Sequence, residues 1–179
     1  MSTSNTSAER EDWPSVPAAS ESPGAAGRLW RDLTLLAVLL LAFALRLWHL
    51  AQNGWGNEYY TAGVLSMTTT WRNLLYNSFD PAGFVSVDKP PVALWIQAAG
   101  VKLFGFHGLS VLIPQVLEGL ASVWVVYHLV QRRFGTSAGL LAALFLAITP
   151  VSVAIDRSSN TDSCLVLVLL LAAWAHAGG

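Results

Sequence analysis

The chain has 179 residues, of which 54% are hydrophobic and 12% are charged, and its formal net charge at pH 7 is −1. Disordered chains combine low hydrophobicity with high net charge, and soluble domains carry about 25% charged residues, so the composition argues against both. A net charge this close to zero gives no indication of a basic surface that would bind nucleic acid. The single cysteine, Cys164, excludes an internal disulfide or a thiolate zinc site. We therefore interpret the chain as an integral membrane protein.

The first 27 residues differ in composition from the rest of the chain. They hold six serines, three prolines and four acidic residues, and they have too few large apolar side chains to offset the entropy of ordering. We expect residues 1–27 to form a disordered tail. Residues 28–179 carry nine Lys/Arg and seven Asp/Glu in clusters between apolar runs, which is typical of a protein that crosses the membrane several times.

Apolar runs predict an all-α polytopic membrane protein with about four transmembrane helices, because a span needs about 20 apolar residues. These runs cover about 33–50, 109–130, 137–155 and 163–177. Arg46 interrupts the first run near its outer end, where we expect it to snorkel to the interface beside Trp48. A cleaved signal peptide is the alternative for this run. Since the chain stops without a polar tail, we expect an N-terminal fragment of a longer protein.

Val92–Phe104 is apolar too, but it is short and contains Gln97 and Lys102, so we expect a helix at the membrane interface and not a span. With this assignment two arginine pairs share one side of the membrane, Arg28 with Arg31 and Arg132 with Arg133. The positive-inside rule assigns that side to the cytoplasm. We therefore expect a plasma-membrane protein with a cytoplasmic N-terminus and with two outer loops, at about 51–108 and 156–162.

The first outer loop contains a predicted helix at roughly 58–76. Apolar side chains recur there on one face at helical spacing, namely Tyr60, Val64, Met67, Trp71 and Leu75. Such a face is typical of a helix lying on the outer leaflet, and equally of one packed on the protein's own spans. Glu58 stands at the start of this helix, where the dipole favours a carboxylate, so a simple capping role and a catalytic role are both open.

A stiff turn follows at Asp88-Lys89-Pro90-Pro91, because the prolines fix the backbone and start the next helix well. The Asp88 carboxylate is a hard ligand for a divalent metal, and the Lys89 ammonium is a compact positive charge for a phosphate. A solvated ion pair is the alternative. The four histidines lie too far apart in the predicted topology to form a metal site.

The second outer loop is polar and ends at Asp162, at the start of the last predicted span. Thr161 or Asp162 could simply cap that helix. Arg157 in the same loop could bind a phosphate group. Charges at the edge of a membrane are costly to place, which raises the expectation that they have a function.

Several of these features together resemble the GT-C membrane glycosyltransferases of family 39. They are an acidic residue after the first span, an amphipathic helix, and a Lys-Pro-Pro turn preceded by a carboxylate. That family includes the protein O-mannosyltransferases and the lipid A aminoarabinose transferases, and Phe84–Pro91 looks especially like the bacterial aminoarabinose-transferase-like branch. The resemblance covers about residues 30–179, which would be the N-terminal spans of such an enzyme.

The resemblance implies a glycosyltransferase that acts at the outer face of the membrane. Its donor would be a sugar on a polyprenyl phosphate, and its acceptor a hydroxyl or phosphate of a lipid, glycan or protein. By this resemblance, Glu58 is the candidate base or a metal contact, Asp88 binds the divalent metal, Lys89 contacts the donor phosphate and Asp162 completes the cavity. The family usually has two adjacent acidic residues after the first span, and here the first of them is Asn57, which we place at the substrate.

Two other functions compete with this reading. Glu118, Pro114 and Gly119 within the second long run would suit a transporter or flippase subunit, because such proteins have charged or broken helices near the membrane midplane. A non-catalytic truncated relative is the other alternative. If the chain is a transferase, we expect this 179-residue piece to be inactive alone, because four spans can hardly enclose the cavity for a lipid-linked donor.

Overall fold

The computed structural model describes residues 25–177, and every regular element in that range is a helix. The elements are α1 (Ala25–Leu47), the short 3-10 helix η1 (Leu50–Asn53), α2 (Glu58–Thr69), α3 (Trp71–Leu75), α4 (Pro91–Phe104), α5 (Gly108–Phe134), α6 (Thr136–Ile148), α7 (Pro150–Asp156) and α8 (Asp162–Ala177). This confirms the all-α class. The predicted disordered tail falls mostly on residues 1–24, outside the described residues, and residues 25–27 form the first turn of α1.

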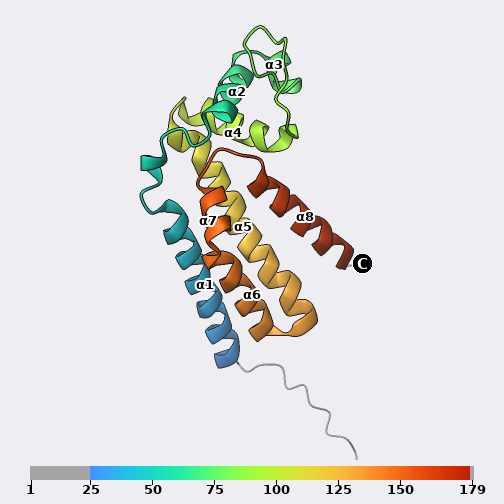
Figure 1. Cartoon of the computed structure of the whole chain (residues 1–179). Helices are drawn as coiled ribbons and strands as arrows, with labels where there is room; N and C mark the ends of the chain where they lie inside the picture. Colours follow the sequence, from blue (N-terminus) through green and yellow to red (C-terminus); the bar gives the residue numbers. More distant parts are fainter. Residues whose placement is uncertain (1–24, 178–179) are drawn as a thin grey trace, which may run out of the picture.

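The long helices form a bundle around α5, with α2, α3 and α4 gathered at one end of it (Figure 1). Where α1, α5 and α6 meet, small side chains alternate with larger ones in a buried cluster of Val38, Ala42, Val123, Tyr127, Ala143 and Ala147. Small residues let helix backbones approach closely, as in membrane helix pairs. Because α1 completes this cluster, a cleaved signal peptide would leave the bundle core unfilled.

One described helix, α5, is long and apolar enough to cross a membrane. The pair α6 and α7 meets the same requirement only as one span, bent by 61° where Thr149 precedes Pro150. Every 18-residue stretch of α1 contains three charged residues, and α4 and α8 are shorter apolar helices of 14 and 16 residues. The predicted total of four spans therefore stays a prediction.

The predicted helix at 58–76 is broken at Thr70. The Thr70 side chain accepts a hydrogen bond from the Asn73 backbone N–H at 3.1 Å and so starts the separate helix α3. Val64 and Met67 are buried against α4, as expected if this face packs on the protein itself, whereas Trp71 is exposed. The prediction of one continuous apolar face is therefore wrong beyond Thr70, because the helix is interrupted there and Trp71 and Leu75 are exposed.

The helix α4 lies across the end of the bundle (Figure 1). Its buried side includes Leu94 and Gln97, and Gly100 lets its backbone approach the Ser110 carbonyl oxygen of α5, because a side chain there would overlap that atom. Its exposed side carries a separate set of apolar side chains, Val92, Trp95, Ile96, Leu103 and Phe104. Such a face is typical of an interfacial helix, and the interfacial placement of α4 stays a prediction.

The loop between α3 and α4 is held by the Asp80 carboxylate, which accepts hydrogen bonds from the backbone N–H groups of Phe84 at 2.9 Å and Val85 at 2.8 Å. These bonds, led by that from Val85, hold the pKa of Asp80 below its usual value, against the smaller opposing effect of burial. The bonds favour the ionised form of the carboxylate. They therefore hold the loop in order fully at pH values above the ordinary aspartate pKa of about 4.

We therefore predict that residues 80–87 lose protection from hydrogen exchange as the pH falls from about 4 through the lowered pKa of Asp80. Asp80→Asn should weaken both bonds at neutral pH and remove this pH dependence. Exchange measured by mass spectrometry between pH 2.5 and 6, with intrinsic exchange rates subtracted, tests the prediction. An identical pH profile in the variant and the parent protein would contradict it.

Candidate active site

Lys89 and Asp162, which are 73 positions apart in the sequence, line one cavity of about 290 Å³. The cavity lies between the start of α4 and the first turns of α8, and most of its other walls are apolar, from Pro90, Val92, Ala93, Cys164, Leu165 and Val168. One cation and one carboxylate therefore line the same cavity, together with Thr161 and mainly apolar residues. Such a pocket suits a ligand with a charged group and an apolar chain.

The turn that carries Lys89 is fixed on both sides. Its backbone carbonyl accepts a hydrogen bond from the Asn77 side chain at 3.0 Å, and α4 begins two residues later at Pro91, after Pro90 at the cap position. Asp88 is exposed and is not among the residues that line the cavity. The ion pairs among residues 25–177 are Arg31–Asp32 and Arg46–Asp156, so the alternative of an Asp88–Lys89 ion pair is not realised.

Asn57 and Glu58 lie at the start of α2. The Asn57 side chain accepts a hydrogen bond from the Tyr59 backbone N–H at 3.1 Å, so Asn57 caps the helix. Glu58 is exposed and lines a different hollow, of about 280 Å³, beside the stacked rings of Trp55 and Phe106. Asn57 therefore supplies the side-chain cap, Glu58 keeps its favourable place in the first turn of α2, and Glu58 is not among the residues that line the cavity of Lys89 and Asp162.

Arg157 ties the second outer loop to the end of α1. Its guanidinium donates a hydrogen bond to the Leu45 carbonyl at 3.0 Å, and its own carbonyl accepts one from the Asn53 side chain at 2.8 Å. This use of Arg157 is structural. Its predicted contact with a phosphate stays a prediction.

The metal expected at Asp88 finds no complete set of ligands within residues 25–177. No group of three His, Cys, Asp or Glu side chains in that range is placed to hold a metal ion. Asp88 could supply one oxygen ligand, and water, substrate phosphate or residues outside the described range would supply the others. We therefore derive no chemical step that depends on a metal.

Arg46 does not snorkel to the interface as the sequence suggested, since it is fully buried. Its guanidinium donates to the Asp156 carboxylate at 2.8 Å, to the Ala147 carbonyl at 3.1 Å and to the Ser152 hydroxyl at 3.1 Å. The prediction failed because the arginine finds a buried carboxylate on α7, which compensates its charge within the bundle. The sequence offered one weak signal for a partner, the carboxylate of Asp156 directly after the third apolar run.

Comparison with known proteins assigns the chain to a family. The model of the family described as "Dolichyl-phosphate-mannose-protein mannosyltransferase" matches residues 88–177, which is half of the chain. The chain belongs to this mannosyltransferase family. The matched region begins at Asp88 and contains Lys89, Arg157 and Asp162, whereas Asn57 and Glu58 lie before it. The description of the family names a transferase and neither a transporter nor a flippase.

Relatives in bacteria agree with the family. The chain is 49% identical over 140 residues to "Putative mannosyltransferase YycA" of Bacillus subtilis, which covers 78% of this chain and 20% of the relative. It is 25% identical over 120 residues to a polyprenol-phosphate-mannose–protein mannosyltransferase of Corynebacterium glutamicum, covering 66% of this chain and 23% of the relative. The chain thus spans about a fifth of the length of the mannosyltransferases it matches. No solved structure matches it.

Proposed function

We propose that the complete protein is a membrane glycosyltransferase that moves a sugar from a polyprenyl-phosphate donor to an acceptor at the outer face of the membrane. The observation that carries this proposal is the cavity shared by Lys89 and Asp162, with its otherwise apolar walls. The Corynebacterium relative, which is named for a polyprenol-phosphate-mannose donor, supports this donor class. Mannose is the sugar that the family name suggests.

In this proposal Lys89 binds the donor phosphate. When the acceptor oxygen attacks the anomeric carbon, the bond from that carbon to the phosphate oxygen breaks and negative charge grows on the departing polyprenyl phosphate. Lys89 and Asp162 are exposed in the described structure, and the ammonium would stabilise that charge more strongly once the bound lipid chain excludes water from the cavity. The apolar walls contributed by α4 and α8 would accommodate the first isoprene units of the lipid.

Asp162 is our candidate for the general base, because it is the carboxylate that lies in the cavity of Lys89. It would accept the proton from an acceptor hydroxyl as the new glycosidic bond forms. Glu58 lies in a separate hollow and would act at the acceptor side, as would Asn57 next to it. If the acceptor is already an anion, such as a phosphate, no base is needed.

The proposed membrane placement follows from the same elements. The exposed apolar side chains of α4 would lie among the lipid head groups, so that the cavity opens where a polyprenyl phosphate would arrive. The protein would lie in the plasma membrane, with its N-terminus in the cytoplasm. A divalent metal would bind at Asp88, and the donor phosphate and water would supply further oxygen ligands. The lipid A aminoarabinose transferase-like activity suggested by Phe84–Pro91 remains an alternative within this class.

The experiment that tests the proposal compares Lys89→Ala with Lys102→Ala in the complete protein. Lys102 is an exposed lysine in the last turn of α4, outside the cavity. With radiolabelled polyprenyl-phosphate mannose in native membranes, the loss of labelled donor, separated from all labelled products by chromatography, reports turnover. Lys89→Ala should reduce turnover by about 10²-fold or more, the usual effect of removing a group that stabilises transition-state charge. Lys102→Ala should stay within twofold. Equal turnover by both variants would contradict the proposal.

A further inference from the structure

A buried polar chain crosses the bundle close to the candidate active site. It runs from Arg46 on α1 through Asp156 at the end of α7 to Ser163 in the first turn of α8, and we call it the Arg46–Asp156–Ser163 chain. One Asp156 carboxylate oxygen accepts from the Arg46 guanidinium at 2.8 Å, and the other accepts from the Ser163 hydroxyl at 2.6 Å. All three residues are buried, and the exposed fractions of Arg46, Asp156 and Ser163 are 0%, 3% and 3%.

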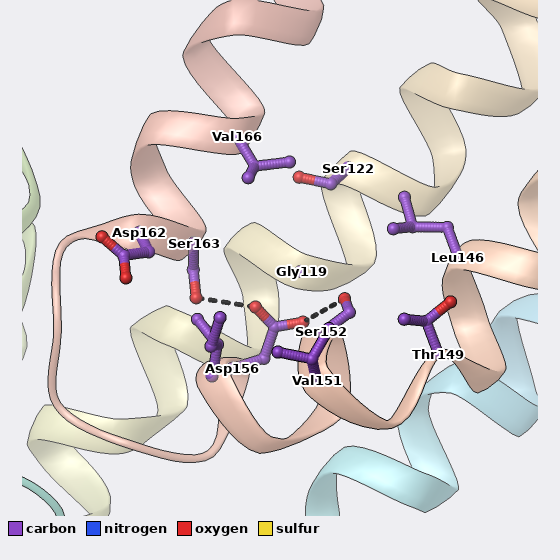
Figure 2. Close-up of a pocket in the computed structure, with 11 residues that line it drawn as sticks. Gly119, Ser122, Leu146, Thr149, Val151, Ser152, Asp156, Asp162, Ser163 and Val166 are labelled. Carbon is purple, nitrogen blue, oxygen red and sulfur yellow. Dashed lines mark hydrogen bonds between the residues drawn. The ribbon is translucent and has the colours of Figure 1, made fainter.

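Helix α5 leaves space for the Arg46–Asp156–Ser163 chain at Gly119. Gly119 of α5 lies directly against it, and a methyl group in place of its hydrogen would overlap the Asp156 carboxylate and the Arg46 guanidinium. Glycine is therefore required here for space. The neighbouring cavity of about 210 Å³ is lined by α5, the α6–α7 junction and α8 (Figure 2).

The loop between α7 and α8 is held from the other side by two glutamines. The side chains of Gln97 on α4 and Gln115 on α5 both donate to the Asn160 carbonyl, at 3.0 and 2.9 Å. The Asn160 side chain in turn accepts from the Asp162 backbone N–H at 2.8 Å. The backbone of Asp162 is therefore fixed by this loop, and the direction of its helix is fixed by the bond from Ser163.

Asp162 and Ser163 point in different directions, although both line the 210 Å³ cavity (Figure 2). Figure 2 shows the Ser163 hydroxyl turned toward Asp156, whereas the Asp162 carboxylate points away from that group. Asp162 also lines the cavity of Lys89. Adjacent residues at the start of one helix thus connect the buried chain with the candidate site.

We propose that the Arg46–Asp156–Ser163 chain is a positioning device that fixes the direction of Asp162 in the cavity of Lys89. The inference rests on the proposed function, in which Asp162 is the base. A buried ion pair is a poor means of gaining stability, because apolar side chains of similar volume serve as well or better. A hydrogen bond to a fixed carboxylate, in contrast, sets direction, and a displacement of about 1 Å at a catalytic group can cost about 10²-fold in rate.

The test uses Ser163→Ala, Ser163→Thr and Ser122→Ala in the complete protein. Ser163→Ala removes the bond to Asp156, and Ser163→Thr keeps the hydroxyl and adds a methyl group beside an existing cavity. Ser122 is the matched control, a buried serine that faces the same 210 Å³ cavity and bonds only to the Glu118 carbonyl of its own helix. We measure kcat and KM for labelled polyprenyl-phosphate mannose, and hydrogen exchange of residues 158–164.

Ser163→Ala should lower kcat about tenfold or more, the effect of losing a hydrogen bond to a charged group, and should leave KM within twofold because Lys89 is intact. It should also speed exchange of residues 158–164. Ser163→Thr should restore both values, and Ser122→Ala should change neither. An unchanged kcat and exchange in Ser163→Ala, or no restoration by threonine, would overturn the inference. If the unmodified protein turns over no donor, the proposed function fails, and the exchange comparison still decides whether the chain positions residues 158–164.

Discussion

Replacing Arg46 by methionine is expected to destabilise the complete protein by about 3–5 kcal/mol, because the Asp156 carboxylate would be left buried without its counter-charge. Arg46 is fully buried and Asp156 is 3% exposed, so water cannot solvate the carboxylate that remains. Arg46 also donates to the Ala147 carbonyl and the Ser152 hydroxyl, and these groups would lose a donor as well. The loss should appear as a lower midpoint of thermal unfolding in detergent.

The double variant Arg46→Met with Asp156→Leu is the control for this result. It removes both charges, and a buried ion pair replaced by apolar side chains is often as stable as the original or more so. Most of the thermal stability should therefore return. Turnover should stay low, because Ser163 has lost its acceptor. A double variant as unstable as Arg46→Met alone would contradict the account of the ion pair.

The second large effect is expected at Asp162. Asp162→Asn keeps the size and shape of the side chain but cannot accept a proton, so turnover of a donor with a hydroxyl acceptor should fall by about 10²–10⁴-fold. Glu58→Gln makes the same chemical change in the separate hollow beside Trp55 and Phe106. Its effect should be at least tenfold smaller.

Initial rates with labelled polyprenyl-phosphate mannose, at equal amounts of inserted protein, check this prediction. Both variants replace a carboxylate by its amide, so the difference between their rates reports only where in the structure the carboxylate lies. A larger loss in Glu58→Gln than in Asp162→Asn would assign the base to the start of α2 and would contradict the role given to Asp162.

Local sequence patterns predicted much of this molecule. The apolar runs gave the helical class, and the Pro90-Pro91 pair indicated the start of α4. The length and polar residues of Val92–Phe104 separated this helix from the long ones. The family resemblance predicted that Asp162 completes the cavity of Lys89, and both residues line one cavity in the structure.

Features that depend on contacts between distant parts of the chain could not be predicted from local sequence patterns. The Arg46–Asp156 pair joins residues 110 positions apart, and the arginine alone fits a helix end at the interface equally well. The break at Thr70 comes from a hydroxyl that competes for the Asn73 backbone N–H, although the periodicity of apolar residues continues through it. The bend at Pro150 had a visible signal, because proline is unfavourable in the interior of a helix.

The measurement that tests the central claim most directly is donor choice by the complete protein. Purified protein in lipid nanodiscs, mixed with extracted membrane acceptors, would receive labelled mannose either on polyprenyl phosphate or as a nucleotide sugar. We predict transfer from the polyprenyl-phosphate donor alone, with the transfer lost in Lys89→Ala and kept in Lys102→Ala. Transfer from the nucleotide sugar, or transfer from the lipid-linked donor that does not depend on Lys89, would contradict the account.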